Sequence, residues 1–145
     1  MLNPIFLRRK IKWIQEDLKF LENYRGMSFD EVAKDTLKWR ALEWTLAKII
    51  GRAIDINRHI IAELADKNIE PPSKHRETFL ILSKLDVLPK IFVEKIADSA
   101  SLRNRIIHEY DDLDQKKVYE TVDEAIEQYA EYGNFILTFL DKQKQ

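Results

Sequence analysis

The sequence predicts an all-α fold, an up-and-down helical bundle of five to six helices. Glycine and proline number only three and four in 145 residues, which favours long helices with few connections. Apolar residues make up 45% of the chain and recur at helical spacing, so each helix has an inward face. The length suits a single domain, residues 1–145, with a core of its own.

Two helices are predicted at the start of the chain. The first runs from about residue 5 to residue 24 and ends at Gly26, because glycine tolerates the left-handed conformation that closes many helices. Ser28 and Glu31 have the spacing of a capping box, so a short helix begins there. The inward positions of the first helix are expected to be Phe6, Ile14, Leu18 and Leu21.

A long helix follows and is expected to be central. Asp35 or Thr36 can cap its start, and its apolar pattern continues to about Asp66. The apolar face is wider than one stripe, which indicates that other helices contact it from two sides. Gly51 lies in the middle of this helix, where glycine costs roughly 1 kcal/mol relative to alanine. A glycine at this position would permit a close helix crossing.

Three further helices are predicted in the second half of the chain. Pro71 and Pro72 forbid helix continuation, so the main loop lies at residues 68–73. Pro89 suits the first residue of a helix, and Asp114 suits an N-cap. The expected helices cover about residues 74–85, 89–107 and 115–141.

The composition indicates a soluble cytoplasmic protein. The chain has no cysteine, which excludes a disulfide framework and fits a reducing compartment. Its first residues lack the charge order of a signal peptide, and no apolar run approaches the length of a membrane span.

The charge distribution restricts how the protein could contact nucleic acid. The net charge of −1 argues against binding over the whole surface. Residues 1–67 carry 13 basic and 10 acidic residues, whereas residues 103–145 carry 6 and 10. Any contact with RNA or DNA must therefore be local.

Arg103 is the first candidate functional residue. Steps of three and four along the predicted helix at residues 89–107 place it on a mostly apolar stripe with Phe92 and Ile106. A guanidinium is almost never buried without a partner. Two hypotheses are equally open: Arg103 pairs with a carboxylate such as Asp55, or the stripe opens onto a cleft or a subunit interface.

His108 is the second candidate, but it does not share a face with Arg103. It follows five residues later, which places the two side chains about 140° apart around an ideal helix. They converge only if the helix frays near Ile107, or if a second copy of the chain supplies the facing residues. A lone histidine at a helix end more commonly interacts with the helix dipole.

The other two histidines are weaker candidates. Asp55 and His59 share a helix face four residues apart, but no further ligand stands at metal-binding spacing. A structural hydrogen bond is therefore the favoured interpretation, and no metal site is predicted. His75 lies at a loop-to-helix junction and is expected to be exposed. The chain also lacks a Gly-rich phosphate loop and a Gly-x-Ser-x-Gly elbow, so most common enzyme classes have no support.

The pattern R-x-x-x-x-H-x-Y, with a polar residue directly after the arginine, matches the segment Arg103-Asn104-Arg105-Ile106-Ile107-His108-Glu109-Tyr110. With this segment the chain resembles the HEPN-domain ribonucleases, specifically the HepT-like toxins of HEPN/MNT toxin–antitoxin pairs. The chain length, the helical order and the position of the motif late in the penultimate long helix extend the resemblance over nearly the whole chain. No departure from the core motif is present.

The resemblance implies an endoribonuclease that acts on RNA without a metal or other cofactor. Members of the family form two-fold homodimers in which both motifs meet at a shared cleft, so two copies of Arg103 and His108 would be supplied. A histidine serves as base or acid toward RNA at neutral pH. Arg103 would hold the phosphate through its planar fork, and Asn104 would orient either group.

The resemblance also implies a protein partner. In HepT-like toxins of type VII-like systems, the motif tyrosine accepts AMP from an MNT-type nucleotidyltransferase antitoxin, and Tyr110 matches that position. A bulky, negatively charged nucleotide two residues from His108 would block the substrate phosphate by charge and volume. Two other hypotheses stay open: a non-catalytic helical nucleotide- or partner-binding subunit of a nucleotidyltransferase, and a structural bundle in which Arg103 pairs internally.

Overall fold

The computed structural model describes residues 1–108, 111 and 113–143. All regular structure in these residues is helical, so the predicted all-α fold is confirmed. None of the described helices has a stretch both long and apolar enough to span a membrane. The elements are α1 Pro4–Leu21, a 3₁₀ turn Glu22–Tyr24, α2 Phe29–Lys34, α3 Thr36–Leu64, α4 His75–Lys84, α5 Lys90–Ile96, α6 Ser99–His108, α7 Gln115–Glu120 and α8 Val122–Gln143.

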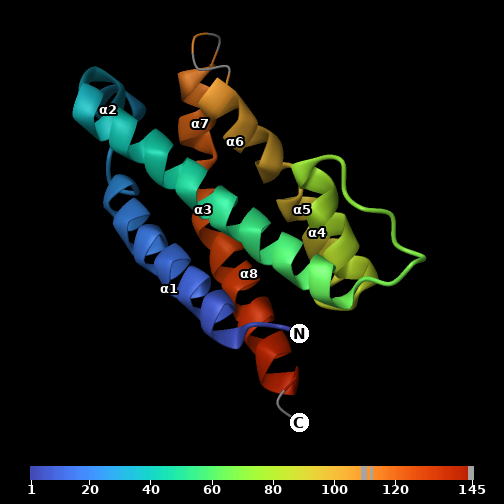
Figure 1. Ribbon diagram of the computed structural model, residues 1–145. Coiled ribbons are helices and arrows are strands. Elements are labelled where there is room, and N and C mark those ends of the chain that lie inside the picture. The colour runs from blue at the N-terminus through green and yellow to red at the C-terminus, as the bar shows by residue number, and fades with distance from the viewer. Residues whose placement is uncertain (109–110, 112, 144–145) are drawn as a thin grey trace.

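The long helix α3 is the centre of the bundle, as its wide apolar face predicted. It packs against α1, α2, α4 and α6, while α8 packs against α1. Figure 1 shows α1 running beside α3 and α8 crossing behind α3, with α4 and α5 beside the second half of α3. The same view shows α6 leading back from α5 toward α7 and α2. This arrangement presents α6, which carries most of the motif, on a platform formed by α3 and α4.

The helix starts follow the capping residues that the sequence predicted. The Ser28 hydroxyl accepts a hydrogen bond from the Glu31 amide at 3.2 Å. The Asp35 carboxylate accepts from two backbone amides of the first turn of α3, at 3.0 and 3.2 Å. The Asp114 carboxylate accepts from the Lys117 amide at 3.2 Å. Each cap satisfies backbone donors that a helix start otherwise leaves free.

Two of the six expected helices are interrupted, which gives eight α-helices in the described residues. The prediction of a single helix at residues 89–107 is wrong. The helix is broken between α5 and α6, where the Ser99 hydroxyl donates a hydrogen bond to the Ile96 carbonyl at 2.6 Å. Similarly, the Thr121 hydroxyl donates to the Val118 carbonyl at 2.7 Å between α7 and α8. Both hydroxyls compete with backbone amides for a carbonyl, which favours a turn over a continuous helix.

The inward face of α1 differs from the expected one. Leu7 and Ile11 are fully buried along with Ile14, Leu18 and Leu21, whereas Phe6 is only half-buried. Phe6 instead lies against the His59 ring, with ring centroids 5.2 Å apart.

A buried chain of hydrogen bonds ties α8, α3 and α4 together. The Tyr132 hydroxyl lies 2.6 Å from the Asn57 side-chain oxygen, and the Asn57 amide donates to the Thr78 hydroxyl at 3.1 Å. Thr78 in turn donates to the His75 carbonyl at 2.7 Å. Buried polar groups that are fully paired in this way specify one arrangement of the helices around them. This series of hydrogen bonds therefore fixes the first turn of α4, where His75 lies, against the centre of the bundle.

Candidate active site

Helix α6 distributes the motif residues over different faces. Leu102 and Ile106 are buried against the bundle. Arg103 is half-buried, whereas Asn104 and His108 are exposed. The helix therefore presents its polar residues on two sides of an apolar anchor.

Arg103 lies across Gly51 of α3. A Cβ atom at position 51 would be 3.1 Å from Arg103 Nε, closer than an ordinary van der Waals contact. The glycine thus makes room for the guanidinium, which is the close approach that its place in mid-helix suggested. In the crossing of α3 and α6, a side chain rather than a helix backbone uses the space.

Arg103 is not neutralised by an internal carboxylate in the described part of the chain. Asp55, the partner considered from the sequence, lies 3.0 Å from Lys10 Nζ. None of the ion pairs among the described residues includes Arg103, and its buried Nε atom has no hydrogen-bond partner there. Arg103 instead lines a hollow of about 190 Å³, which it shares with Trp44, Arg52 and Asp55 of α3, without an ion pair to Asp55. Of the two hypotheses for Arg103, the structure supports the one in which its stripe opens onto a cleft.

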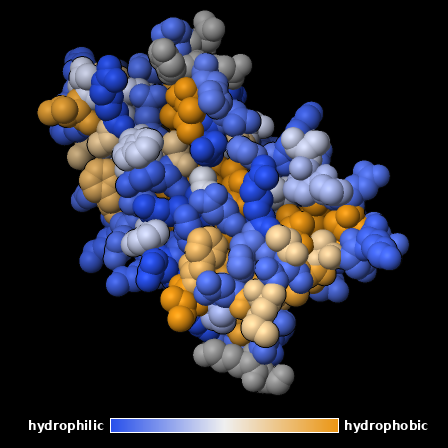
Figure 2. All heavy atoms as spheres, viewed as in Figure 1, coloured by the Kyte–Doolittle hydropathy of each residue, from blue (hydrophilic) through white to orange (hydrophobic). Residues whose placement is uncertain are grey.

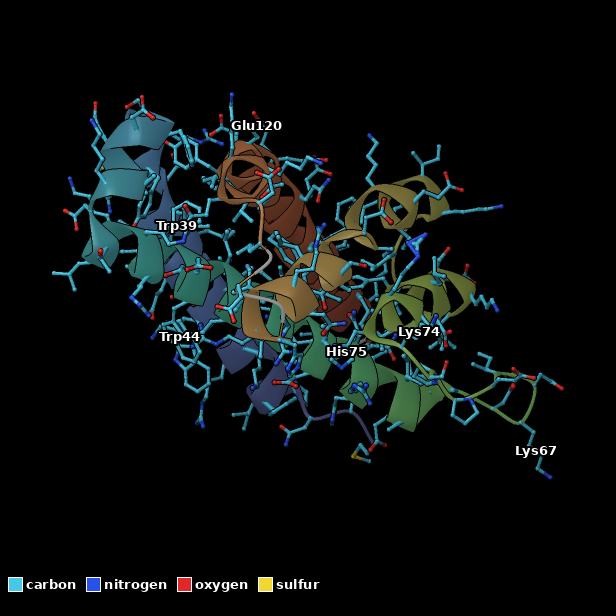
Figure 3. The ribbon with its side chains drawn as sticks, turned by 90° about the horizontal axis from the view of Figure 1, so that it is seen from above. Trp39, Trp44, Lys67, Lys74, His75 and Glu120 are labelled. Carbon is cyan, nitrogen blue, oxygen red and sulfur yellow. The ribbon has the colours of Figure 1, made fainter. Side chains whose placement is uncertain are left out.

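An apolar groove adjoins the hollow that contains Arg103. The groove has a volume of about 600 Å³ and runs between the first half of α3 and the end of α6. Trp44 and Ile107 line both the groove and the hollow. Trp44 is 63% exposed, and Figure 3 shows its ring extending from α3 to the outside of the bundle. The groove's other apolar walls include Trp39, Ala47, Ile106 and Leu113.

His108 faces a different depression from Arg103. It is the last residue of α6, and it lines a shallow depression of about 750 Å³ with Asp98, Ser101, Asn104 and Arg105. None of these residues lines the Arg103 hollow. One copy of the chain therefore does not bring Arg103 and His108 together, as the angle between them on the helix predicted.

His75 was expected to be exposed, and that expectation is wrong. The residue is half-buried at the start of α4, and its Nδ1 atom is buried without a hydrogen-bond partner among the described residues. Figure 3 shows it where α4 meets α3 and α6. Burial lowers the pKa of His75, and the positive charges of Arg58 and Arg103 lower it further, against a smaller opposing effect of Asp55. Each of the lowering effects favours the neutral form of His75.

His59 has the structural role that the sequence favoured. Its Nε2 atom accepts a hydrogen bond from the Asn3 backbone amide at 3.0 Å, which fixes the start of α1 on α3. Within the described ranges, no three or more acidic or histidine side chains are grouped so that they could hold a metal ion. Tyr110, the expected acceptor of AMP, lies outside the described residues, as do Glu109 and Asp112.

Comparison with known proteins relates nearly the whole chain to one family. A family model described as ribonuclease HepT-like matches residues 14–136. A tRNA nuclease HepT from Aphanizomenon flos-aquae (strain 2012/KM1/D3) is 30% identical over 139 residues, which cover 96% of this chain and 92% of that protein.

Solved structures share the fold at lower sequence identity. A tri-AMPylated Shewanella oneidensis HEPN toxin in complex with MNT antitoxin has a TM-score of 0.80 at 20% identity, over 94% of this chain and 99% of that chain. The cytosolic protein of unknown function YutE from Bacillus subtilis has a TM-score of 0.80 at 12% identity, over 94% of this chain and 90% of that one. At such identities the similarity establishes the fold.

The burial of His75 predicts a pH dependence of stability. Its pKa is lowered in the folded state, so in acid the unfolded chain binds a proton first. The contribution of neutral His75 to the free energy of unfolding is fully present above about pH 6.5, the ordinary pKa of histidine. It is lost as the pH falls toward the lowered pKa of the folded state. In urea titrations, the free energy of unfolding should fall more steeply from pH 7 to pH 5 in the wild type than in His75→Gln. Equal slopes for wild type and His75→Gln would contradict the assignment.

Proposed function

Because the chain belongs to the HepT-like ribonuclease family, we propose that it is the toxin of a type VII-like HEPN/MNT toxin–antitoxin pair and cleaves RNA at a site shared by two copies. As a member of that family it is an endoribonuclease. The observation that carries the proposal is the position of Arg103, half-buried over Gly51 and without a carboxylate partner among the described residues. A positive charge held in this way is available to a substrate phosphate.

The proposed chemistry is transfer of the phosphate within the RNA chain, without a metal. The 2′-hydroxyl loses its proton to a base and attacks the adjacent phosphorus, while the 5′-oxygen of the next nucleotide leaves and takes a proton from an acid. The products carry a 2′,3′-cyclic phosphate and a 5′-hydroxyl. His108 supplies base or acid, since an imidazole exchanges protons near neutral pH. Arg103 opposes the charge that develops on the phosphorane, and Asn104 orients the phosphate or the histidine.

The proposed site needs a second copy of the chain. One copy provides one His108, and it faces a depression separate from that of Arg103. In a two-fold dimer the same surface of both copies meets, so Arg103 of one copy can approach His108 of the other. The apolar groove between α3 and α6 is the surface we assign to this contact. It contains the exposed Trp44 ring, which a second copy would cover.

The proposed substrate is tRNA, the substrate in the name of the Aphanizomenon relative. The overall charge of −1 is compatible with this because the cations lie together around α3, α4 and α6. Besides Arg103, they include Arg58 and Lys74, which take part in no ion pair among the described residues, whereas Arg52 and Lys48 pair with Asp17.

The proposed regulation acts through Tyr110, two residues after His108 in the motif. The tyrosine hydroxyl attacks the α-phosphate of ATP bound to the MNT-type nucleotidyltransferase antitoxin, pyrophosphate leaves, and the tyrosine keeps AMP. The added phosphate repels the RNA phosphate beside His108, and the nucleoside fills the space of a substrate nucleotide. The Shewanella toxin, which is tri-AMPylated and in complex with its MNT antitoxin, supports this assignment.

The catalytic assignment predicts the effect of two substitutions. Unmodified protein should cleave tRNA in EDTA and leave 2′,3′-cyclic phosphate ends, and Arg103→Ala or His108→Ala should lower the rate by on the order of 100-fold or more. The control variant Arg9→Ala removes an exposed arginine on α1 and should cleave at the wild-type rate. Wild-type cleavage by either Arg103→Ala or His108→Ala, with folding intact, would refute the site. RNA binding with no new cyclic phosphate ends would instead favour a non-catalytic binding subunit.

The regulatory assignment predicts a change in mass. Protein produced together with its nucleotidyltransferase partner should gain whole AMP units relative to protein produced alone. The gain should vanish in Tyr110→Phe and persist in Tyr119→Phe, where the changed tyrosine is half-buried and contacts the Met27 carbonyl. Intact-mass spectrometry gives both results. An undiminished gain in Tyr110→Phe would move the modification to another residue.

A further inference from the structure

A second hollow lies on the other side of α6 from the Trp44 groove. Its volume is about 410 Å³, and it lies between the start of α4 and one face of α6. Ser101 and Asn104 line both this hollow and the depression that contains His108. The two surfaces are therefore continuous across α6, and a chain bound at His108 can extend toward α4. From α4 the hollow is lined by Ser73, Lys74, His75 and Arg76.

The acidic groups around this hollow are already engaged. Asp98 accepts a hydrogen bond from Arg76 at 2.7 Å, and Asp55 pairs with Lys10 at 3.0 Å. The Glu77 carboxylate accepts from the Ser73 amide at 2.8 Å and from its hydroxyl, and these hydrogen bonds lower the pKa of Glu77, with a smaller contribution from Lys74. The carboxylate of each thus has a hydrogen-bonding or ion-pairing neighbour.

Two cations beside the hollow keep their charge free of ion pairs within the described chain. Lys74 and Arg58 are both exposed, and neither takes part in the ion pairs of the described residues. His75 follows Lys74 directly, and Asn57, which precedes Arg58 on α3, donates a hydrogen bond to Thr78, whose hydroxyl donates to the His75 carbonyl. The charge of Arg58 also lowers the pKa of His75. Figure 3 shows Lys74 and His75 together at the start of α4.

The junction of α3, α4 and α6 contains the buried polar side-chain atoms that lack a hydrogen-bond partner in the described part of the chain. Among those residues, two buried side-chain atoms have no hydrogen-bond partner, His75 Nδ1 and Arg103 Nε. Folded proteins pair nearly all such atoms, and exceptions occur where a water, an ion or a ligand completes the set. Both atoms belong to the α3–α4–α6 junction, which also carries the two free cations. This combination favours a site for an anion.

We propose that Lys74, Arg58 and His75 form a second phosphate-binding site, which holds the phosphate next to the one that is cleaved. The inference rests on the proposed ribonuclease function, because RNA has one phosphate per nucleotide and a chain cut at His108 carries further phosphates on both sides. Lys74 and Arg58 supply the charge, and the His75 ring, whose Nδ1 atom has no partner among the described residues, supplies a hydrogen-bonding group. The site thereby extends recognition beyond the scissile bond and sets a minimum length for an efficient substrate.

The test compares substrates with one phosphate and with several. The substrates are a dinucleoside monophosphate and an RNA octanucleotide, and the variants are Lys74→Gln and Arg58→Gln. In each variant, the ratio of kcat/KM for the octanucleotide to that for the dinucleotide should fall on the order of tenfold, as expected for loss of a charge-assisted contact. Lys67→Gln, which removes an exposed lysine in the loop before α4, is the matched control and should keep the wild-type ratio.

A binding measurement separates failure of this site from failure of the proposed function. The ligand is an octanucleotide that lacks 2′-hydroxyls and cannot be cut. Log affinity for it falls as log salt concentration rises, and in each variant this negative slope should become shallower by about 0.7, the value for one lost phosphate contact. Unchanged salt slopes would overturn the second phosphate site whether or not the wild type cleaves RNA, and unchanged ratios would overturn it in a protein that does cleave. A variant that lost activity equally on both substrates would also overturn it, since that result indicates a general structural effect. A wild type that binds but does not cleave would overturn only the ribonuclease proposal.

Discussion

The contact between Arg103 and Gly51 is the constraint on which the rest of the site depends. Helix α6 crosses α3 with the guanidinium laid over the glycine, where a Cβ atom would stand 3.1 Å from Nε. A larger residue at position 51 would push the charge away from α3 or move α6. Glycine destabilises a helix interior by roughly 1 kcal/mol relative to alanine, so Gly51 lowers the stability of α3 while making room for Arg103. The benefit is a half-buried arginine that points into a hollow beside an apolar groove.

The distribution of carboxylates explains how a slightly acidic chain can present a basic site. Asp55 is held by Lys10, Asp98 by Arg76, and Asp17 by Arg52 at 2.5 Å. Each of these carboxylates therefore has a basic partner other than Arg103. On the face shown in Figure 2, hydrophobic residues reach the surface in separate patches among hydrophilic ones. The charge available to RNA is therefore set by which cations lack a carboxylate, and the net charge of the chain says little about it.

Local features of the sequence predicted much of the fold, and long-range packing determined what they missed. The caps Ser28, Asp35 and Asp114 act within one helical turn, so spacing alone identified them. The angle between Arg103 and His108 was likewise fixed by helix geometry. The break before α6 was missed, because the Ser99 hydroxyl that marks it also contacts Tyr129 from a distant helix. The burial of His75 was missed for the same reason: it follows from docking α4 on α3 and α6, and no local pattern encodes that docking. The choice between the two hypotheses for Arg103 depended on Lys10. Its ammonium group donates a hydrogen bond to Asp55, which lies 45 residues away in the sequence.

The central claim is that the ribonuclease site is complete only in a pair of chains, with Arg103 and His108 approaching from different copies. The most direct measurement follows cleavage per chain over a dilution series in which sedimentation gives the dimer fraction at each concentration. We expect the rate per chain to fall in proportion to the dimer fraction and to approach zero for the monomer. A monomer that cleaves RNA at the rate of the dimer would contradict the claim, because the residues of a single chain would then be sufficient.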